Sequence, residues 1–198
     1  MLDYAPASVL IMLITTSLSL YALYRSNEIL YKFILHPYSL VREKKYYTII
    51  TSSFLHGDFF HLLFNMLSFY FFGPQIEYWV GTLNFLIIYF GSMIIADIPT
   101  ILKHKNNYNY RSLGASGAVS GIIFSFIVFQ PFGIIYAFFI PMPSIVFAIL
   151  FLLYGWWMER RGIDFINHSA HNWGAIAGFI ITIIIIPGAF NHFINHLF

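Results

Sequence analysis

The sequence of 198 residues contains no cysteine and few charged side chains. Without cysteine the chain can form neither a disulfide nor a thiolate metal site, and its redox compartment stays open. Charged residues make up 9% and hydrophobic residues 59% of the chain, whereas a soluble domain averages about 25% and about 45–50%. A soluble protein of this length could not bury so much apolar surface, so lipid must be the solvent for much of it. The net charge of +2 is too small and too dispersed to indicate nucleic-acid binding.

Long apolar runs predict an all-α, polytopic membrane protein. A helix needs about 20 mostly apolar residues to cross the hydrocarbon core of a bilayer. Six stretches qualify, at about residues 7–24, 58–78, 82–102, 114–130, 143–158 and 168–188. Pro131, Pro141 and Pro143 separate the fourth stretch from the fifth by a short connection. We therefore expect one domain over residues 1–198, a multi-pass bundle of six transmembrane helices with the cell membrane as its expected location.

Two stretches outside these helices are less apolar. Residues 25–57 are too polar to span a membrane but are rich in Tyr, Phe and Leu, which predicts a folded, interfacial loop. His192 and His196 follow the last predicted helix, and we expect them in a solvated tail.

Helix parity groups the polar residues of the predicted helices. Helices two, four and six run in the same direction, so their N-terminal ends lie on the same side of the membrane. Polar side chains gather near those ends: His56, His61, Asn65, Ser116, His168 and His171. Because polar groups inside a bilayer are costly, they mark a functional site.

Small residues predict that helices four and six touch. Gly117 and Gly121 on one helix, and Gly174 and Gly178 on the other, have the four-residue spacing that lets transmembrane backbones approach closely. This contact would bring Ser116 beside His171. A serine hydroxyl becomes a nucleophile when a base takes its proton, and imidazole is the usual base. The pair therefore predicts acyl transfer.

Donors for an oxyanion are available nearby. His61 and Asn65 are four residues apart and share one helix face, and the Ser116 amide lies near a helix N-terminus. No acidic residue has a spacing that would orient His171, which favours a dyad over a triad. Asp97 lies in the third helix beside Pro99 without an evident partner.

Each of these residues also has an ordinary structural interpretation. A serine on a small-residue helix face usually packs against a neighbouring helix, and a histidine near a membrane surface usually bonds to a carbonyl. His168, three residues before His171, fits an interface residue better than a second base.

Three motifs resemble the rhomboid family of intramembrane serine proteases. The segment Phe54–Asn65 carries a His followed by His-x-x-x-Asn. Gly114-Ala115-Ser116-Gly117 matches Gly-x-Ser-Gly, and Ala170-His171-Asn172-Trp173-Gly174 resembles Ala-His-x-x-Gly. They occur in the family's order on helices two, four and six.

The resemblance implies specific roles. Ser116 would be the nucleophile and His171 the general base, while His61, Asn65 and the Ser116 amide would form the oxyanion hole. His56, Gly114 and Gly117 would support them, and Gly73 with Glu77 would be structural. Helix five would be a gate and residues 159–167 a cap. The substrates would be single-pass membrane proteins, with no cofactor or metal required.

Two positions depart from the family pattern. Tyr46 and Tyr47 stand where many relatives carry Trp-Arg in the first loop. Ser120 stands where many relatives carry an aromatic residue that packs on the catalytic histidine, so the His171 ring must be oriented in another way.

Four other functions remain as alternatives. An inactive rhomboid-like protein would bind membrane clients without cutting them, and a histidine-lined transporter would need charged residues in its helices. A metalloprotease should carry His-Glu-x-x-His, which is absent. An aspartyl protease would need two intramembrane aspartates, and helix placement offers only Asp97.

Charge and resemblance disagree on orientation. All ten Lys and Arg residues lie at or within the first, third and fifth loops. The positive-inside rule predicts that these loops, and with them the mouth of the site, face the cytoplasm. The resemblance implies the opposite orientation, which we adopt as the expectation.

Overall fold

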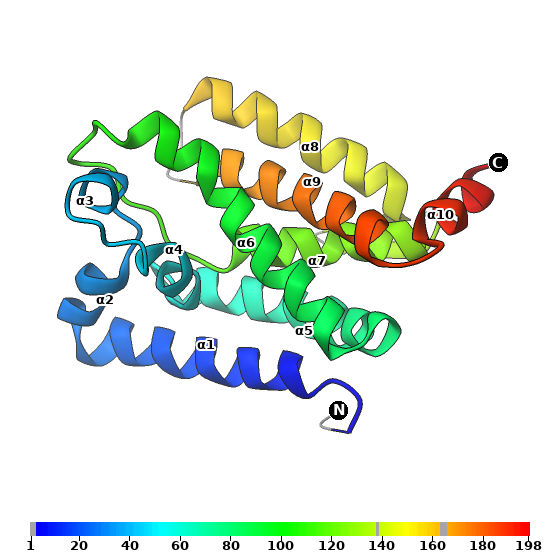
Figure 1. The fold of residues 1–198 in the computed structure, drawn as a ribbon, viewed down its shortest axis with the longest axis horizontal. Helices are drawn as coiled ribbons and strands as arrows, with labels where there is room; N and C mark the ends of the chain where they lie inside the picture. Colours follow the sequence, from blue (N-terminus) through cyan, green and yellow to red (C-terminus); the bar gives the residue numbers. More distant parts are fainter. Residues whose placement is uncertain (1–2, 138, 163–165) are drawn as a thin grey trace.

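The computed structural model describes residues 3–137, 139–162 and 166–198 as a helical bundle with one small hairpin (Figure 1). The long helices are α1 (Pro6–Arg25), α5 (Phe59–Val80), α6 (Thr82–His104), α7 (Ser116–Phe129), α8 (Ser144–Arg161) and α9 (His168–Ile185). The short elements are α2 (Asn27–Phe33), α3 (Pro37–Arg42), α4 (Thr48–Thr51), η1 (Ser52–Phe54), β1 (Ile134–Ala137), β2 (Ile140–Pro143) and α10 (Ala189–Leu197). Residues 163–165 of the predicted cap lie outside the described residues, as does residue 138.

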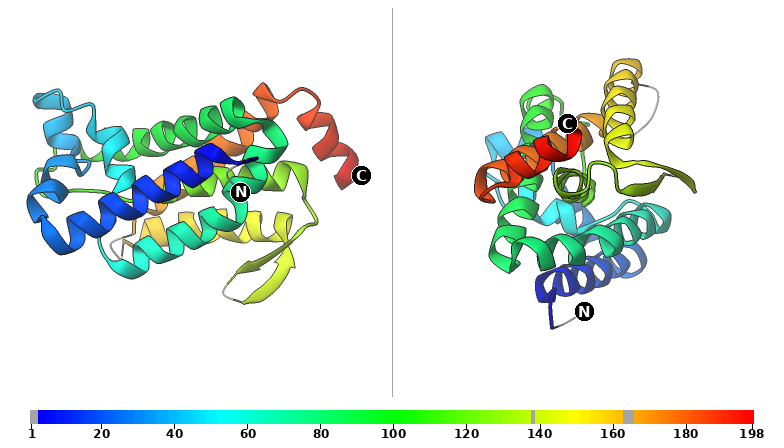
Figure 2. Two further views of the ribbon diagram at one scale, coloured as in Figure 1. Left: turned by 90° about the horizontal axis from the view of Figure 1, so that it is seen from below. Right: turned by 90° about the vertical axis from the view of Figure 1, so that its right-hand side faces the viewer.

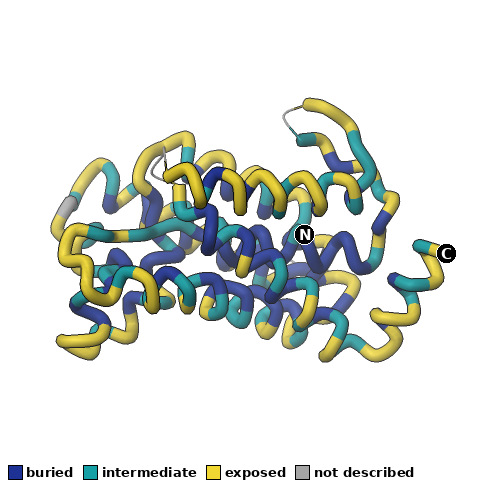
Figure 3. The backbone as a smooth tube through the Cα atoms, turned by 90° about the horizontal axis from the view of Figure 1, so that it is seen from above, coloured by how far each residue is buried: buried dark blue, intermediate teal, exposed yellow. Residues whose placement is uncertain are grey.

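Helix α7 is the centre of the bundle. Eleven of its 14 residues are buried, and Figure 2 (right) shows it almost end-on with the other long helices around it. Buried positions follow the inner sides of the helices, whereas their outer sides are exposed (Figure 3). Those outer sides carry large apolar residues such as Leu13, Phe71 and Ile184. This arrangement is that of an integral membrane protein, in which lipid covers the outside.

The long helices are not equally suited to crossing a membrane alone. Within the described ranges α1, α6 and α9 have both the length and the hydropathy of a span, and α7 is a shorter apolar helix. At about 1.5 Å per residue, 14 residues extend about 21 Å, less than the about 30 Å hydrocarbon core. Since α7 is enclosed by protein, it has no need to reach both surfaces of the membrane.

Helices α7 and α9 pack backbone to backbone, as the small-residue spacing predicts. A Cβ atom added to Gly174 would overlap the carbonyl of Gly117, and one added to Gly178 would overlap the backbone of Gly121. Only glycine permits this approach. The two catalytic candidates therefore project from helices whose separation is set by glycine.

Helix α1 is fastened to α5 by a buried carboxylate. Glu77 is 1% exposed, and its two oxygens accept hydrogen bonds from the amides of Ala7 (3.0 Å) and Ser8 (2.7 Å). The hydroxyl of Thr82 donates a third bond, of 2.8 Å. The first amides of a helix lack internal partners and favour a negative charge, so Glu77 caps α1 from the neighbouring helix. Glu77 is thus structural, in agreement with the family resemblance.

The segment between α1 and α5 is folded, as expected, through α2, α3, α4 and η1. Arg42 joins it to the loop after α6, since its guanidinium donates to the Lys105 carbonyl at 2.6 Å and to the Asn106 side chain at 3.0 Å. Leu35 and Ser112 form a β-bridge between the same two loops. The two loops therefore form one layer at the end of the bundle where α7 and α9 begin.

One expectation from the sequence was wrong, and one connection has a structure that the sequence did not specify. The connection after α7 is an antiparallel hairpin of β1 and β2, in which Ala137 pairs with Ile140, and it projects sideways from the bundle (Figure 2, left). The predicted solvated tail is the helix α10, because His192 Nε2 donates to the Phe129 carbonyl at 2.9 Å and Phe193 is buried against the bundle.

Candidate active site

A cavity of about 590 Å³ opens where α5, α7 and α9 begin. It is lined by six of the predicted site residues: Ser116, His171, His61, Asn65, Gly114 and Gly117. His56 lies behind the wall of the cavity rather than in it. The structure therefore brings together side chains that are up to 110 positions apart in the sequence.

Ser116 and His171 project from the point where three helices meet. A Cβ atom on Gly117 would lie 2.7 Å from the Ala96 Cβ on α6 and 3.5 Å from the Ala170 carbonyl on α9. Gly117 follows Ser116 and Ala170 precedes His171, so the two candidates are neighbours of this contact. Both side chains are half-buried, which leaves them accessible from the cavity.

Gly114 leaves room for the imidazole of His61. Its φ of +119° lies in a region that residues with a Cβ atom rarely adopt. A Cβ atom there would also lie 2.8 Å from His61 Nε2. The backbone of α5 is fixed at this point, because Asp58 caps the helix by accepting from the His61 amide at 2.8 Å. His61 is thus held against the loop that leads into α7.

Asn65 lies one turn below His61 on the same face of α5. Its side-chain nitrogen donates to the His61 carbonyl at 2.9 Å, which uses one of the two N–H groups of the amide. The residue is buried and lines the cavity. Its second N–H group is thereby available to a ligand in the cavity.

His56 supports the loop that precedes the nucleophile. Its Nε2 accepts from the Ala115 amide at 3.4 Å, so the proton of the neutral ring must be on Nδ1. Nδ1 then donates to Ser19 Oγ at 2.9 Å, and this hydroxyl donates to the Phe54 carbonyl at 2.9 Å. The ring is fully buried. Burial, with a smaller contribution from His61, lowers the pKa of His56 to about 3, which keeps the ring neutral.

The first turn of α7 presents backbone amides to the cavity. Within the described residues Ala115, at the N-cap, supplies no side-chain hydrogen bond to this turn. Ser116, Gly117 and Ala118 all line the cavity. Amides at a helix N-terminus that no side chain caps form an anion-binding site.

Asn167 anchors the start of α9, and the sequence analysis did not identify it. Its Oδ1 accepts from the Ala170 amide at 3.1 Å, and its Nδ2 donates to Thr100 on α6 (2.9 Å) and to Ser112 (3.2 Å). An asparagine just before an apolar helix is a capping signal that could have pointed to it. The bonds tie the helix of His171 to α6 and to the loop before α7.

The ring of His168 packs on His171. Their centroids lie 6.1 Å apart in an edge-to-face arrangement, and His168 meets Tyr154 of α8 in the same way at 5.9 Å. His168 is buried between these two rings. It supplies an aromatic contact to His171, the kind of contact that Ser120 cannot make.

Asp97 also lines the cavity, which the sequence did not predict. The sequence analysis judged from chain spacing that no acidic residue lies near Ser116 and His171. Chain spacing could not show that α6, which carries Asp97, packs beside α7 and α9. Burial, and to a smaller extent the nearby Asp97 carboxylate, raise the pKa of Tyr110, another residue of the cavity wall. Among the described residues no three His, Asp or Glu side chains are grouped as metal ligands.

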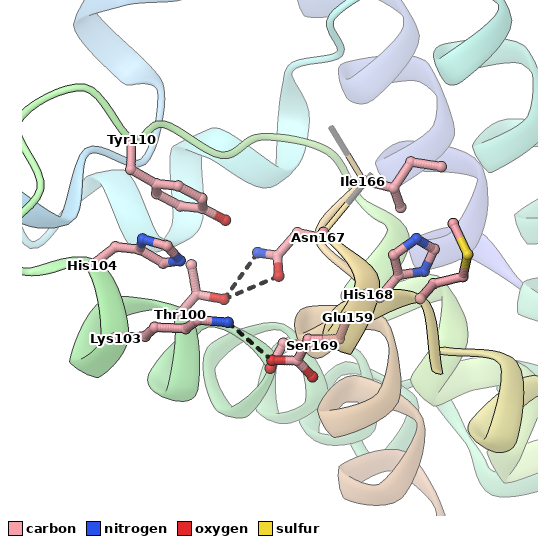
Figure 4. A pocket seen from close by; sticks show the side chains of 11 residues that line it. Thr100, Lys103, His104, Tyr110, Glu159, Ile166, Asn167, His168 and Ser169 are labelled. Carbon is pink, nitrogen blue, oxygen red and sulfur yellow. Dashed lines mark hydrogen bonds and ion pairs between the residues drawn. The ribbon is translucent and has the colours of Figure 1, made fainter. Parts of the chain in front are cut away.

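A smaller cavity of about 160 Å³ adjoins the first one (Figure 4). Tyr110, Ile166 and Asn167 line both cavities. On the rim, Lys103 Nζ lies 3.4 Å from Glu159 Oε1, and this ion pair links the end of α6 to the end of α8. The polar space thus continues from the dyad toward the gap between these two helix ends.

Comparison with known proteins gives consistent matches. Residues 43–188 match the sequence model of the Rhomboid domain. The rhomboid-named protein YdcA of Bacillus subtilis (strain 168) is 39% identical over 82 residues, which are 41% of this chain and 40% of that protein. RHOMBOID-like protein 12, mitochondrial, of Arabidopsis thaliana is 29% identical over 160 residues, covering 73% of this chain and 48% of that protein. Inactive RHOMBOID-like protein 8 of Arabidopsis thaliana is 32% identical over 85 residues, covering 43% and 23%. The chain thus covers less than half of the length of each relative.

Proposed function

Because this chain belongs to the rhomboid family, we propose that it is an intramembrane serine endopeptidase acting on transmembrane segments of other proteins. Ser116 would be its nucleophile and His171 its general base. The observation that carries the proposal is that both residues line one cavity, beside a backbone contact between their helices that only glycine allows. The activity of the family supports this reading.

The first chemical step uses the dyad. Ser116 Oγ attacks the scissile carbonyl carbon while the His171 imidazole takes the hydroxyl proton. The tetrahedral intermediate collapses as the imidazolium gives that proton to the leaving amine, which releases one product and leaves an acyl-Ser116 ester. Water, deprotonated by the same imidazole, then hydrolyses the ester and restores the free serine.

The developing oxyanion needs donors that are already in position. We assign this role to the Ser116 amide at the start of α7, the His61 ring and the second N–H group of Asn65, because all three residues line the cavity. Each such donor is typically worth about 3 kcal/mol of transition-state stabilisation. Because several donors share the role, loss of Asn65 alone should leave partial activity.

Helix α8 would be the gate through which a substrate enters. Asn172, next to His171, donates to the Leu152 carbonyl at 3.2 Å, and Gly155 packs directly on the Asn172 side chain. The Lys103–Glu159 pair holds the C-terminal end of α8. Because few polar contacts among the described residues hold α8 against its neighbours, the helix could swing away from the site to admit a substrate.

A serine-reactive fluorophosphonate probe tests the function without knowledge of the natural substrate. The wild type in detergent should be labelled and should cleave a model transmembrane substrate, with no effect of chelators. Ser116→Ala should lose both activities, and His171→Ala should lose cleavage, by at least about 10⁴-fold. Asn65→Ala should lose about a hundredfold in kcat.

Ser120→Ala is the matched control, since Ser120 is buried in the same helix but does not line the cavity. It should label and cleave like the wild type. Equal cleavage by Ser116→Ala, or loss of cleavage on adding a chelator, would refute the serine mechanism. Absence of labelling and cleavage in the folded wild type would favour an inactive rhomboid, as the name of one Arabidopsis relative describes.

A further inference from the structure

We propose that Asp97 forms a subsite of the catalytic cavity that takes a basic side chain from the unwound segment of the substrate. The inference rests on the proposed proteolytic function and names a substrate class for it. The substrates would be membrane proteins that carry Lys or Arg close to the scissile bond.

The position of Asp97 follows from its neighbours on α6. Ala96 contacts Gly117, which adjoins the nucleophile, and Thr100 is hydrogen-bonded to Asn167 at the start of α9. Asp97 lies between these two contacts and lines the cavity. Its carboxylate therefore borders the space that the substrate backbone must occupy to reach Ser116.

The other buried or cavity-lining acidic residues described have a structural use. Asp58 caps α5 through the His61 amide, and Glu77 caps α1 through two amides. The two ion pairs among the described residues, Lys45–Glu43 and Lys103–Glu159, lie elsewhere. Asp97 makes no hydrogen bond or ion pair within the described part of the chain.

The Asp97 carboxyl group is partly exposed to the cavity and has no protein partner among the described residues, so it can accept a hydrogen bond or an ion pair from a ligand there. Arg111 lines the same cavity, but its guanidinium lies 5.9 Å from the Tyr108 ring and donates to the Tyr108 carbonyl at the exposed rim. Among the described residues no cationic side chain is paired with Asp97, so we assign a cationic group of the substrate as its complement.

Matched substrates test the subsite. A model transmembrane substrate is prepared with Lys, Gln or Glu at each of the three positions on either side of the scissile bond, and kcat/KM is measured for each. At one position the wild type should prefer Lys over Glu by at least about tenfold. Asp97→Asn should lose the preference, so that its kcat/KM values for the Lys and Glu substrates become equal. Arg111→Gln, which changes a charge at the rim, should keep it.

Binding is measured in parallel on Ser116→Ala, which cannot cleave. It should bind the Lys peptide more tightly than the Glu peptide, and the double variant with Asp97→Asn should bind both equally. The subsite is refuted if the wild type shows no preference at any position. It is also refuted if Asp97→Asn slows all substrates by the same factor, because the residue would then act through the dyad or the fold. Failure of the proteolytic function would show as cleavage that does not depend on Ser116, which is a separate outcome.

Discussion

Acidification should destabilise the protein through His56. The ring is fully buried, donates to Ser19 and accepts from the Ala115 amide, so both ring nitrogens are used in the neutral form. Protonation of Nε2 would place an N–H group against the Ala115 N–H group, two donors facing each other in a fully buried site. The folded state therefore holds His56 neutral, whereas the unfolded state binds a proton at the ordinary pKa.

The magnitude follows from the two pKa values of this group. The pKa of His56 is lowered from 6.5 to about 3 on folding. The unfolded chain therefore binds more protons than the folded one between these values. Above pH 6.5 the His56 ring does not lower the free energy of unfolding, and this free energy decreases as the pH falls below that value. The loss is about 1.4 kcal/mol per pH unit between the two pKa values, or about 2 kcal/mol at about pH 5 and about 4 kcal/mol at about pH 3.

The assay is reversible unfolding by SDS in mixed micelles at a series of pH values. His56→Gln removes the titrating group, so its unfolding free energy should fall less steeply than that of the wild type between about pH 6 and about pH 4. The difference in slope should be close to about 1.4 kcal/mol per pH unit. His196→Gln, which changes an exposed ring, should follow the wild type. Equal slopes for the wild type and His56→Gln would refute the reasoning.

Two further predictions concern packing and capping. Gly178→Ala should lower the unfolding free energy by about 1–3 kcal/mol in the same SDS assay, because its methyl group would overlap backbone. Gly57→Ala, where a Cβ atom would lie 3.8 Å from the nearest side chain, should change it by less than about 0.5 kcal/mol, and equal effects would argue against the close contact. Glu77→Gln should cost about 1.5–3 kcal/mol and should speed hydrogen exchange at the amides of Ala7 and Ser8. Unchanged protection at those amides would contradict the cap.

The helices and the grouping of the candidate residues at one end of the bundle were predictable because their signals are local. Apolar runs define the long helices, and the four-residue spacing of glycines on α7 and α9 indicates their contact. Helix direction then groups Ser116, His171, His61 and Asn65 at one end of the bundle. None of these steps requires knowledge of the lateral order of the helices, that is, of which helices pack side by side in the bundle.

The features that were missed depend on lateral order. The position of Asp97 beside the dyad follows only when α6 is known to pack against both α7 and α9. The hairpin after α7 was hidden because Pro141 and Pro143 indicate a break without specifying the pairing that β2 adopts. Helix α10 was hidden because His192 finds its acceptor, the Phe129 carbonyl, on a distant helix end.

The Glu77 cap has a consequence for how the protein can be divided. The family match begins at residue 43, after the whole of α1. Yet α1 supplies the amides that satisfy Glu77 and the Ser19 hydroxyl that orients His56. A fragment limited to residues 43–188 would retain a carboxylate and an imidazole deprived of their partners. The folding unit is therefore larger than the range that sequence comparison detects. Helix α1 lies outside that range, yet its hydrogen bonds help to fix the geometry of the site.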